Sequence, residues 1–275
     1  MLAPRRFFFD NRTMPFTLAH PAAALPFRKT GLVISAVVIG SMAPDFEYFL
    51  RMAPQGRFGH TLLGLVIFTL PLALAVLWLF HRSAKFAMVK LLPTCVQQRI
   101  ICATDFPFGN ARRFALLVLS VLAGALTHIV WDSFTHNQSW LVAYWPLLRK
   151  TVVISWLTPR SLPVWKVLQH LSTLIGMGIL AAWFIAWLRR TAPAQTIDSP
   201  LSRGAKLRVV LLLLALALCG ALLRTVLFRP TSHISRFGAF GVFVVTAIAL
   251  LWWELVALGW WWRPWQAFRP NLSQS

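Results

Sequence analysis

The stretch FALLVLSVLAGALTHIVWDSFTH, residues 114–136, decides the fold class of this chain. Its first part, Phe114–Trp131, contains no Asp, Glu, Lys or Arg and is close to the length of about 20 residues that crosses a bilayer. Its last part places His128, Asp132 and His136 at positions i, i+4 and i+8. On an α-helix such residues lie on one stripe. We therefore expect a membrane-spanning helix with a polar stripe at one end.

The residue types in this stripe favour two interpretations. Two imidazoles and a carboxylate on one helix face are typical metal ligands. The same side chains can instead form hydrogen bonds that hold packed membrane helices together. The local pattern by itself leaves both interpretations open.

The composition of the whole chain agrees with a membrane protein. Of 275 residues, 58% are hydrophobic and 12% are charged, and the mean hydropathy is +0.66. This is too apolar for a soluble globular domain. The net charge of +20 comes from basic residues that lie mostly in loops between apolar segments. We therefore expect a lipid bilayer with anionic headgroups as the partner of these residues, and no nucleic acid.

Apolar runs along the chain predict how often it enters the membrane. A short run, Phe16–Phe27, is joined to the first longer one by a turn-like link and predicts a helical hairpin. The sequence therefore predicts an all-α, polytopic integral membrane protein with about six transmembrane helices and a short N-terminal helical hairpin. The expected segments are Leu32–Phe46, Thr61–Phe80, Phe114–Trp131, Val167–Leu188, Val209–Phe228 and Phe237–Trp260.

The chain divides into three parts by composition. Residues 1–13 precede Met14, a possible alternative start, and are expected to be a non-native or disordered extension. Residues 14–188 form a membrane domain that carries the polar residues. Residues 189–275 add two further helices that end in a Trp-rich belt, which is typical of anchoring at a membrane interface.

The remaining polar residues fall at segment ends that alternation places on one side of the membrane. The hairpin brings His20 and Asp45 to the same level. His60 begins the second long segment, and His170 begins the fourth. Because scattered polar residues would not share one depth, this agreement predicts a single cluster together with the stripe on residues 128–136.

Loop charges predict the orientation of that cluster. The loops at residues 81–113 and 189–208 carry more Lys and Arg than the loops on the other side. The positive-inside rule makes these loops cytoplasmic. The His/Asp cluster is therefore expected on the outer face.

Five motifs resemble a family of bacterial multi-spanning membrane proteins, domain of unknown function 4184. The motifs are MPFTLAHPAAALP, SAVVIGSMAPDFEYF, GHTLLGL, THIVWDSFTH and LQHLST, at residues 14–26, 35–49, 59–65, 127–136 and 168–173. The resemblance implies a bacterial inner-membrane location. More distantly, the order His, Pro-Asp, His, His-x3-Asp is similar to a group of membrane-bound metal-dependent hydrolases. That likeness implies a metal site built from His20, Asp45, His60, His128 and Asp132.

These residue types are consistent with the metal ligands and catalytic groups of a hydrolase. A divalent metal, with zinc the first expectation, binds imidazole and carboxylate ligands and activates water. His136 and His170 are candidate additional ligands, and Glu47 and Asp45 are the candidate catalytic residues. The neighbouring Arg51 and Arg57 are expected to hold a substrate phosphate. The expected substrate is a phosphoester or a lipid-like molecule at the membrane surface.

Two other functions remain open at this point. Buried His and Asp residues also mark proton relays and metal-ion pathways in transporters. The cluster can alternatively lock helices together in a non-enzymatic scaffold. A transporter would place polar residues on helices that reach both sides, whereas here they gather at one end.

Overall fold

The computed structural model describes residues 17–56, 58–100, 106, 108–137, 139–153, 161–193, 201–227 and 236–262. These residues are predominantly helical, and five helical stretches are long and apolar enough to cross a membrane. The predicted all-α polytopic membrane fold is thus confirmed. The five stretches are Leu62–Leu91, Ala111–Tyr144, Val164–Arg190, Arg203–Leu227 and Gly238–Trp261.

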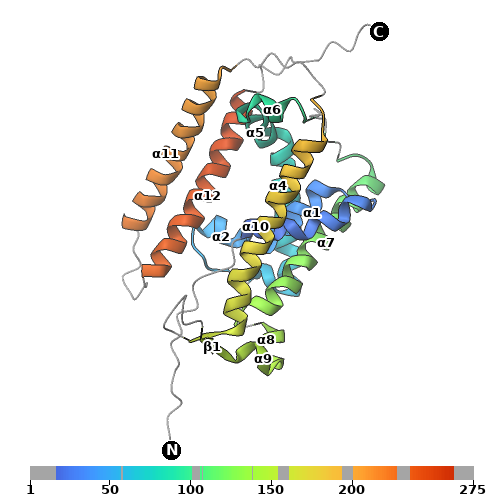
Figure 1. Cartoon of the computed structure of the whole chain (residues 1–275). Coiled ribbons are helices and arrows are strands. Elements are labelled where there is room, and N and C mark those ends of the chain that lie inside the picture. The colour runs from blue at the N-terminus through green and yellow to red at the C-terminus, as the bar shows by residue number, and fades with distance from the viewer. Residues whose placement is uncertain are drawn as a thin grey trace, which may run out of the picture.

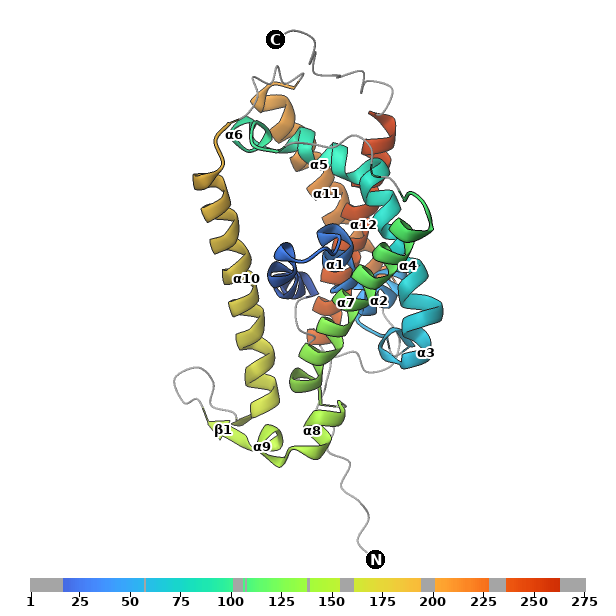
Figure 2. The ribbon, with the colours of Figure 1, turned by 90° about the vertical axis from the view of Figure 1, so that its right-hand side faces the viewer.

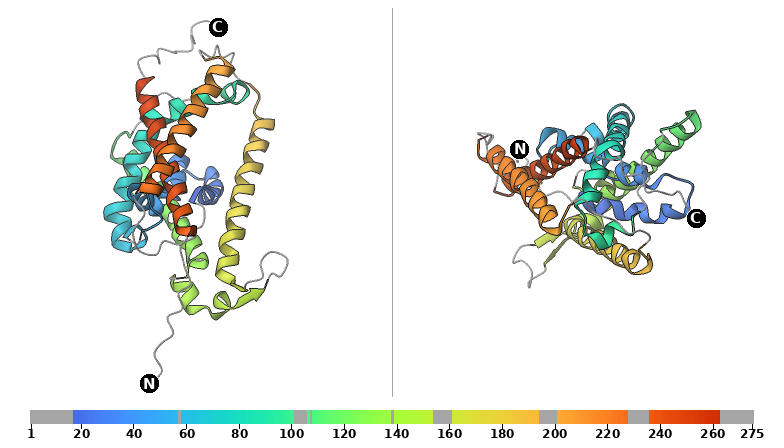
Figure 3. Two further views of the ribbon diagram at one scale, coloured as in Figure 1. Left: turned by 90° about the vertical axis from the view of Figure 1, so that its left-hand side faces the viewer. Right: turned by 90° about the horizontal axis from the view of Figure 1, so that it is seen from above.

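Four long helices follow the apolar runs of the sequence closely (Figure 1). They are α7 (Ala111–Thr135), α10 (Val164–Arg190), α11 (Arg203–Leu227) and α12 (Arg236–Trp261). The last two pack side by side as a pair, which Figure 3 shows from two further directions. Asn110 caps α7, because its side chain accepts a hydrogen bond from the backbone N–H of Arg113.

The stretch Leu62–Leu91 is a succession of short helical pieces. Two of them, η4 and η5, are π-helical turns. Pro71 at the beginning of α4 lacks a backbone N–H donor, so the regular ladder is interrupted where η4 ends. The pieces are α3 (Leu62–Gly64), η4 (Leu65–Thr69), α4 (Leu70–Leu79), η5 (Phe80–Ala84) and α5 (Lys85–Leu91).

The predicted N-terminal hairpin is present and consists of η1 (Thr17–Lys29) and α1 (Ile34–Gly40). Figure 2 shows it between α10 and α7. Pro21 and Pro26 remove backbone donors from η1, which is a 3₁₀-helix and not an α-helix.

The first expected crossing differs from the sequence-based expectation. Leu32–Phe46 does not form one helix: α1 is followed by a turn, by η2 (Ala43–Asp45) and by α2 (Phe46–Arg51). Pro44 within this turn interrupts the α-helical hydrogen bonds. The segment therefore enters the bundle and ends inside it at Asp45.

The hairpin and α7 touch through their backbones. A Cβ atom at Gly40 would overlap the carbonyl group of Val121, and one at Gly124 would overlap the carbonyl oxygen of Val37. Small residues at such contacts are the usual way in which membrane helices approach closely. This contact adjoins the main apolar core, whose buried members are Ala36, Ile39, Ala43, Ala73, Leu77, Leu117 and Val121.

Short elements cap the two ends of the bundle. In Figure 1, α8, α9 and β1 lie together at one end of α7 and α10, whereas α5 and α6 lie at the opposite end. Strands β1 and β2 form a small antiparallel hairpin in which Val152 pairs with Leu162. The short elements are η3 (Phe58–His60), α6 (Thr94–Gln97), α8 (Trp140–Tyr144), α9 (Pro146–Arg149), β1 (Thr151–Val153) and β2 (Ser161–Pro163).

Candidate metal centre

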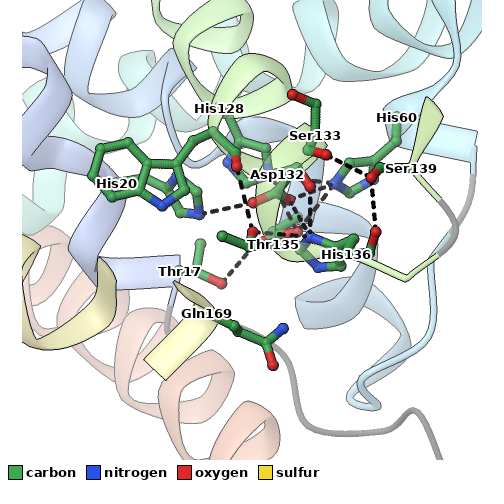
Figure 4. A network of polar contacts seen from close by, with 12 residues as sticks. Thr17, His20, His60, His128, Asp132, Ser133, Thr135, His136, Ser139 and Gln169 are labelled. Carbon is green, nitrogen blue, oxygen red and sulfur yellow. Dashed lines mark hydrogen bonds and ion pairs between the residues drawn. The ribbon is translucent and has the colours of Figure 1, made fainter. Parts of the chain in front are cut away.

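Four side chains from three separate parts of the chain converge beside the end of α7. Figure 4 shows three of them, His60, His128 and Asp132. Asp45 ends η2, His60 ends η3, and His128 and Asp132 lie one turn apart on α7. One donor atom from each of the four lies within 4.8 Å of each of the others. The η2 turn, the η3 turn and α7 therefore each contribute to one buried polar centre.

The spacing of the donor atoms matches the size of a metal coordination sphere. Nε2 of His60 lies 3.3 Å from Nε2 of His128, 3.4 Å from Oδ1 of Asp45 and 3.6 Å from Oδ2 of Asp132. Nε2 of His128 lies 3.6 Å from the same oxygen of Asp45 and 3.0 Å from that of Asp132. A tetrahedral ion with bonds of about 2.0–2.2 Å has ligand–ligand distances of about 3.3–3.6 Å. The four residues thus fit one divalent ion.

The His128 ring is fixed with Nε2 toward the centre. The ring is fully buried, and its Nδ1 lies 2.8 Å from the backbone carbonyl oxygen of Ser41. A carbonyl oxygen only accepts, so Nδ1 carries the proton and the lone pair of Nε2 faces the cluster. Two imidazole nitrogens that face each other at 3.3 Å, as those of His60 and His128 do, require a proton or a cation between them.

Asp45 is held by a residue that the sequence analysis did not single out. The hydroxyl group of Thr17 donates a hydrogen bond of 2.7 Å to Oδ2 of Asp45. The other carboxylate oxygen, Oδ1, lies 3.4 Å from Nε2 of His60 and 3.6 Å from Nε2 of His128. Thr17 lies inside the MPFTLAHPAAALP motif, but a lone threonine in an apolar run gives no sequence signal for this role.

His20 lies directly beside the four-residue centre. Its ring stacks on that of His128 with a centroid separation of 4.0 Å, and its Nε2 lies 3.5 Å from Oδ1 of Asp132. Within the described part of the chain, neither of these two buried atoms has a hydrogen-bond partner. Because an unsatisfied buried polar atom is costly, the pair is suited to a water molecule or an additional ligand beside the centre.

The other two predicted histidine ligands lie in different environments. Nδ1 of His136 is 3.5 Å from Oδ2 of Asp132, and this side chain, at 30% exposed, forms the outer edge of the cluster. His170 is exposed on α10 and lies outside the cluster. Its neighbour Gln169 is buried, because one residue step turns an α-helix by about 100°. A ligand role for His170 therefore stays a prediction.

Glu47 hydrogen-bonds the backbone of the turn that carries His60, and we call this contact the clamp. Oε2 of Glu47 accepts hydrogen bonds from the backbone N–H groups of Phe58 at 2.9 Å and Gly59 at 3.3 Å. Its Oε1 accepts from the Arg51 guanidinium, with Nε at 3.0 Å and the nearer terminal nitrogen at 2.8 Å. Burial raises the pKa of Glu47, but the hydrogen bonds from Gly59, Arg51 and Phe58 outweigh it and bring this pKa below its usual value.

The other predicted roles around Glu47 stay predictions. A catalytic role for Glu47 is compatible with an ionised carboxylate, although both of its oxygens are occupied by the clamp. Arg51 keeps a side chain that is 60% exposed and pairs with Glu47. Arg57, the second predicted phosphate ligand, and residues 1–13 lie outside the described residues.

Replacing Glu47 with glutamine separates these two roles. A residue that only positions a metal ligand typically contributes about 10–100-fold to metal affinity, so a clamp that acts through His60 predicts a loss of that size for added zinc. The amide keeps one acceptor oxygen but turns an N–H₂ group toward backbone donors. Metal dissociation constants from competition with a chromogenic chelator measure the effect. Unchanged affinity with lost turnover would instead identify Glu47 as the general base and contradict the clamp.

Comparisons with known proteins place the chain in a family without assigning an activity. The family model described as domain of unknown function 4184 matches residues 14–260. This match continues beyond the quoted motifs and covers α11 and most of α12. No curated protein and no solved structure matches the chain.

Proposed function

This chain belongs to the family of domain of unknown function 4184, and from that premise we propose that it is a membrane-embedded, metal-dependent hydrolase of phosphoesters. The observation that carries the proposal is the spacing of the donor atoms of Asp45, His60, His128 and Asp132. A cluster that served helix packing alone would not need two imidazole nitrogens turned toward each other beside two carboxylates.

The donor set favours zinc as the bound ion. Imidazole nitrogen and carboxylate oxygen are common ligands of zinc, and Mn²⁺ is the second ion to test. A metal of this kind lowers the pKa of a bound water toward about 7 and polarises a phosphoryl oxygen. Asp45, His60, His128 and Asp132 would hold the ion, and a substrate would reach it from the side of His60 and His136, whose side chains are 25% and 30% exposed.

The side chains around the centre supply the proton transfers of the proposed reaction. The water oxygen bonds to phosphorus while the bond between phosphorus and the ester oxygen breaks. Oδ1 of Asp132 accepts a proton from this water, since no described residue hydrogen-bonds that atom. The ester oxygen leaves with a proton from His136, the most exposed imidazole of the cluster. Arg51 is the candidate ligand of the substrate phosphate.

We also propose that the protein lies in a bacterial cell membrane with the centre on the outer face. Basic residues at the far ends of the spanning helices support this orientation through the positive-inside rule. They include Lys85, Lys90, Arg112, Arg113, Arg189, Arg190, Arg203 and Lys206. The end that carries the centre has fewer basic residues.

Hydrolysis assays on the metal-loaded chain test the proposal. The full chain, purified in mild detergent without chelators and loaded with zinc or manganese, is offered p-nitrophenyl phosphate, its diester analogue and short-chain phospholipids. We expect turnover that needs the metal and is lost in Asp45→Asn. A chain that retains its ion but hydrolyses none of these esters would overturn the hydrolase and favour an ion pathway or a scaffold.

A further inference from the structure

The segment after α7 builds a small platform at the same end of the molecule as the centre. Elements α8 and α9 have an inner apolar face, where Val142 and Leu148 pack with Trp165 at the start of α10. Ser139 fixes the platform to α7, because its hydroxyl group donates a 2.6 Å hydrogen bond to the carbonyl oxygen of Ser133. The platform is therefore bonded to the end of α7 and packs against the start of α10.

The outer face of this platform is aromatic and exposed. Tyr144 is 83% exposed and Trp140 is 62% exposed. Such a patch is unfavourable in water and usually marks a contact surface. Trp and Tyr are the residues enriched where a membrane meets water, because each has an apolar ring and a polar group. We call this surface the aromatic platform; its exposed members are Trp140, Tyr144, Trp145, Leu147 and Val153.

The charges beside the aromatic platform have one sign. Arg149 and Lys150 are exposed at its edge. The sequence contains no acidic residue between Asp132 and Asp198. An uncompensated positive edge next to aromatic side chains attracts anionic lipid headgroups. A surface that binds a protein would be expected to carry both basic and acidic residues. Residues 133–197 contain no acidic residue.

Helix lengths place the aromatic platform at the membrane surface. Helix α7 has 25 residues and is therefore about 37 Å long, more than the hydrocarbon core of about 30 Å. Asp132 lies in its last turn, and α8 begins shortly after it. The metal centre and the aromatic platform thus lie at neighbouring depths, near the boundary between headgroups and acyl chains.

We propose that the aromatic platform lies in the interfacial layer and binds the headgroups of anionic phospholipids. The proposal needs only the membrane-spanning fold and the surface just described. Its consequence for the substrate rests on the proposed function: a hydrolase held at this depth meets phosphoesters of the lipid headgroup layer.

Depth-dependent fluorescence quenching tests this placement. In the full chain, Cys95, Cys102 and Cys219 are replaced with serine, and Tyr144→Cys carries a small fluorophore. The protein is reconstituted in lipid nanodiscs that contain spin-labelled lipids. We expect stronger quenching by a label on the headgroup than by one deep in the acyl chain. A matched control keeps Cys219, which is exposed midway along α11, as its single cysteine and should show the opposite order.

Lipid charge provides the second arm of the experiment. We expect spin-labelled anionic lipid to quench the Tyr144→Cys probe at least about twofold more than zwitterionic lipid at equal density. Combined Arg149→Gln and Lys150→Gln changes should remove this preference. A probe that neither lipid quenches would overturn the proposal, as would quenching without any charge preference. Metal content, measured on the same samples, tests the proposed function separately.

Discussion

Asp132→Ala is expected to abolish stoichiometric metal binding, and His128→Ala is expected to do the same. Asp132 lies close to four imidazoles: Oδ2 is 3.0 Å from His128, 3.5 Å from His136 and 3.6 Å from His60, and Oδ1 is 3.5 Å from His20. Loss of a residue that only supports a ligand costs about 10–100-fold in affinity, so loss of a ligand itself should cost more. Elemental analysis of chain purified without chelators gives the metal-to-protein ratio directly.

Two matched variants make this result specific. His170→Ala removes a histidine that the sequence predicted as a ligand but that is exposed on α10, so it should leave the metal content unchanged. Glu254→Gln removes a carboxylate from α12, whose Oε2 has no partner among the described residues, and should also have no effect. Asp132→Asn keeps the packing volume and separates loss of a ligand from misfolding. Metal retained by folded Asp132→Ala and His128→Ala would refute the centre.

Gly124→Leu is expected to lower stability and metal binding together. A side chain at this position meets backbone atoms of Val37, Gly40 and Ser41, which cannot move without displacing α1. Overpacking of a close contact costs about 1–3 kcal/mol of folding free energy. Displacement of α1 also breaks the contact between the Ser41 carbonyl oxygen and His128, and it shifts Asp45 away from α7. Thermal unfolding in detergent and metal content measure the two effects.

Gly178→Leu is the matched control for this substitution. Gly178 lies on α10, and apart from its own turn of that helix no described atom lies within 4 Å of a Cβ atom built there. Because glycine is the poorer helix former, the change should be neutral or slightly stabilising and should leave bound metal intact. An equal loss of stability in both variants would show that membrane insertion, and not the contact between α1 and α7, accounts for the effect.

The sequence alone determined the membrane fold and the main candidates for the centre. A membrane-spanning segment can be recognised from consecutive residues alone. It must be apolar over the thickness of the bilayer, regardless of which helices it packs against. The i, i+4 spacing of His128 and Asp132 is also local, because helix geometry fixes which residues share a face. The alternation of segments further predicted that His20, Asp45 and His60 lie at one level.

Only the tertiary structure decided how those residues are arranged and supported. The expected crossing Leu32–Phe46 is interrupted inside the bundle by the turn at Pro44. Asp45 therefore lies beside α7 within the bundle, and not at the end of a helix that crosses the membrane. The burial of Gln169 and the exposure of His170 follow from the rotation of α10 against η1, which apolar periodicity does not set. The contacts of Ser41 with His128 and of Glu47 with η3 join distant residues through backbone atoms. Every residue other than proline has the same backbone N–H and C=O groups, so the sequence carries no signal for such contacts, and close packing of the chain creates them.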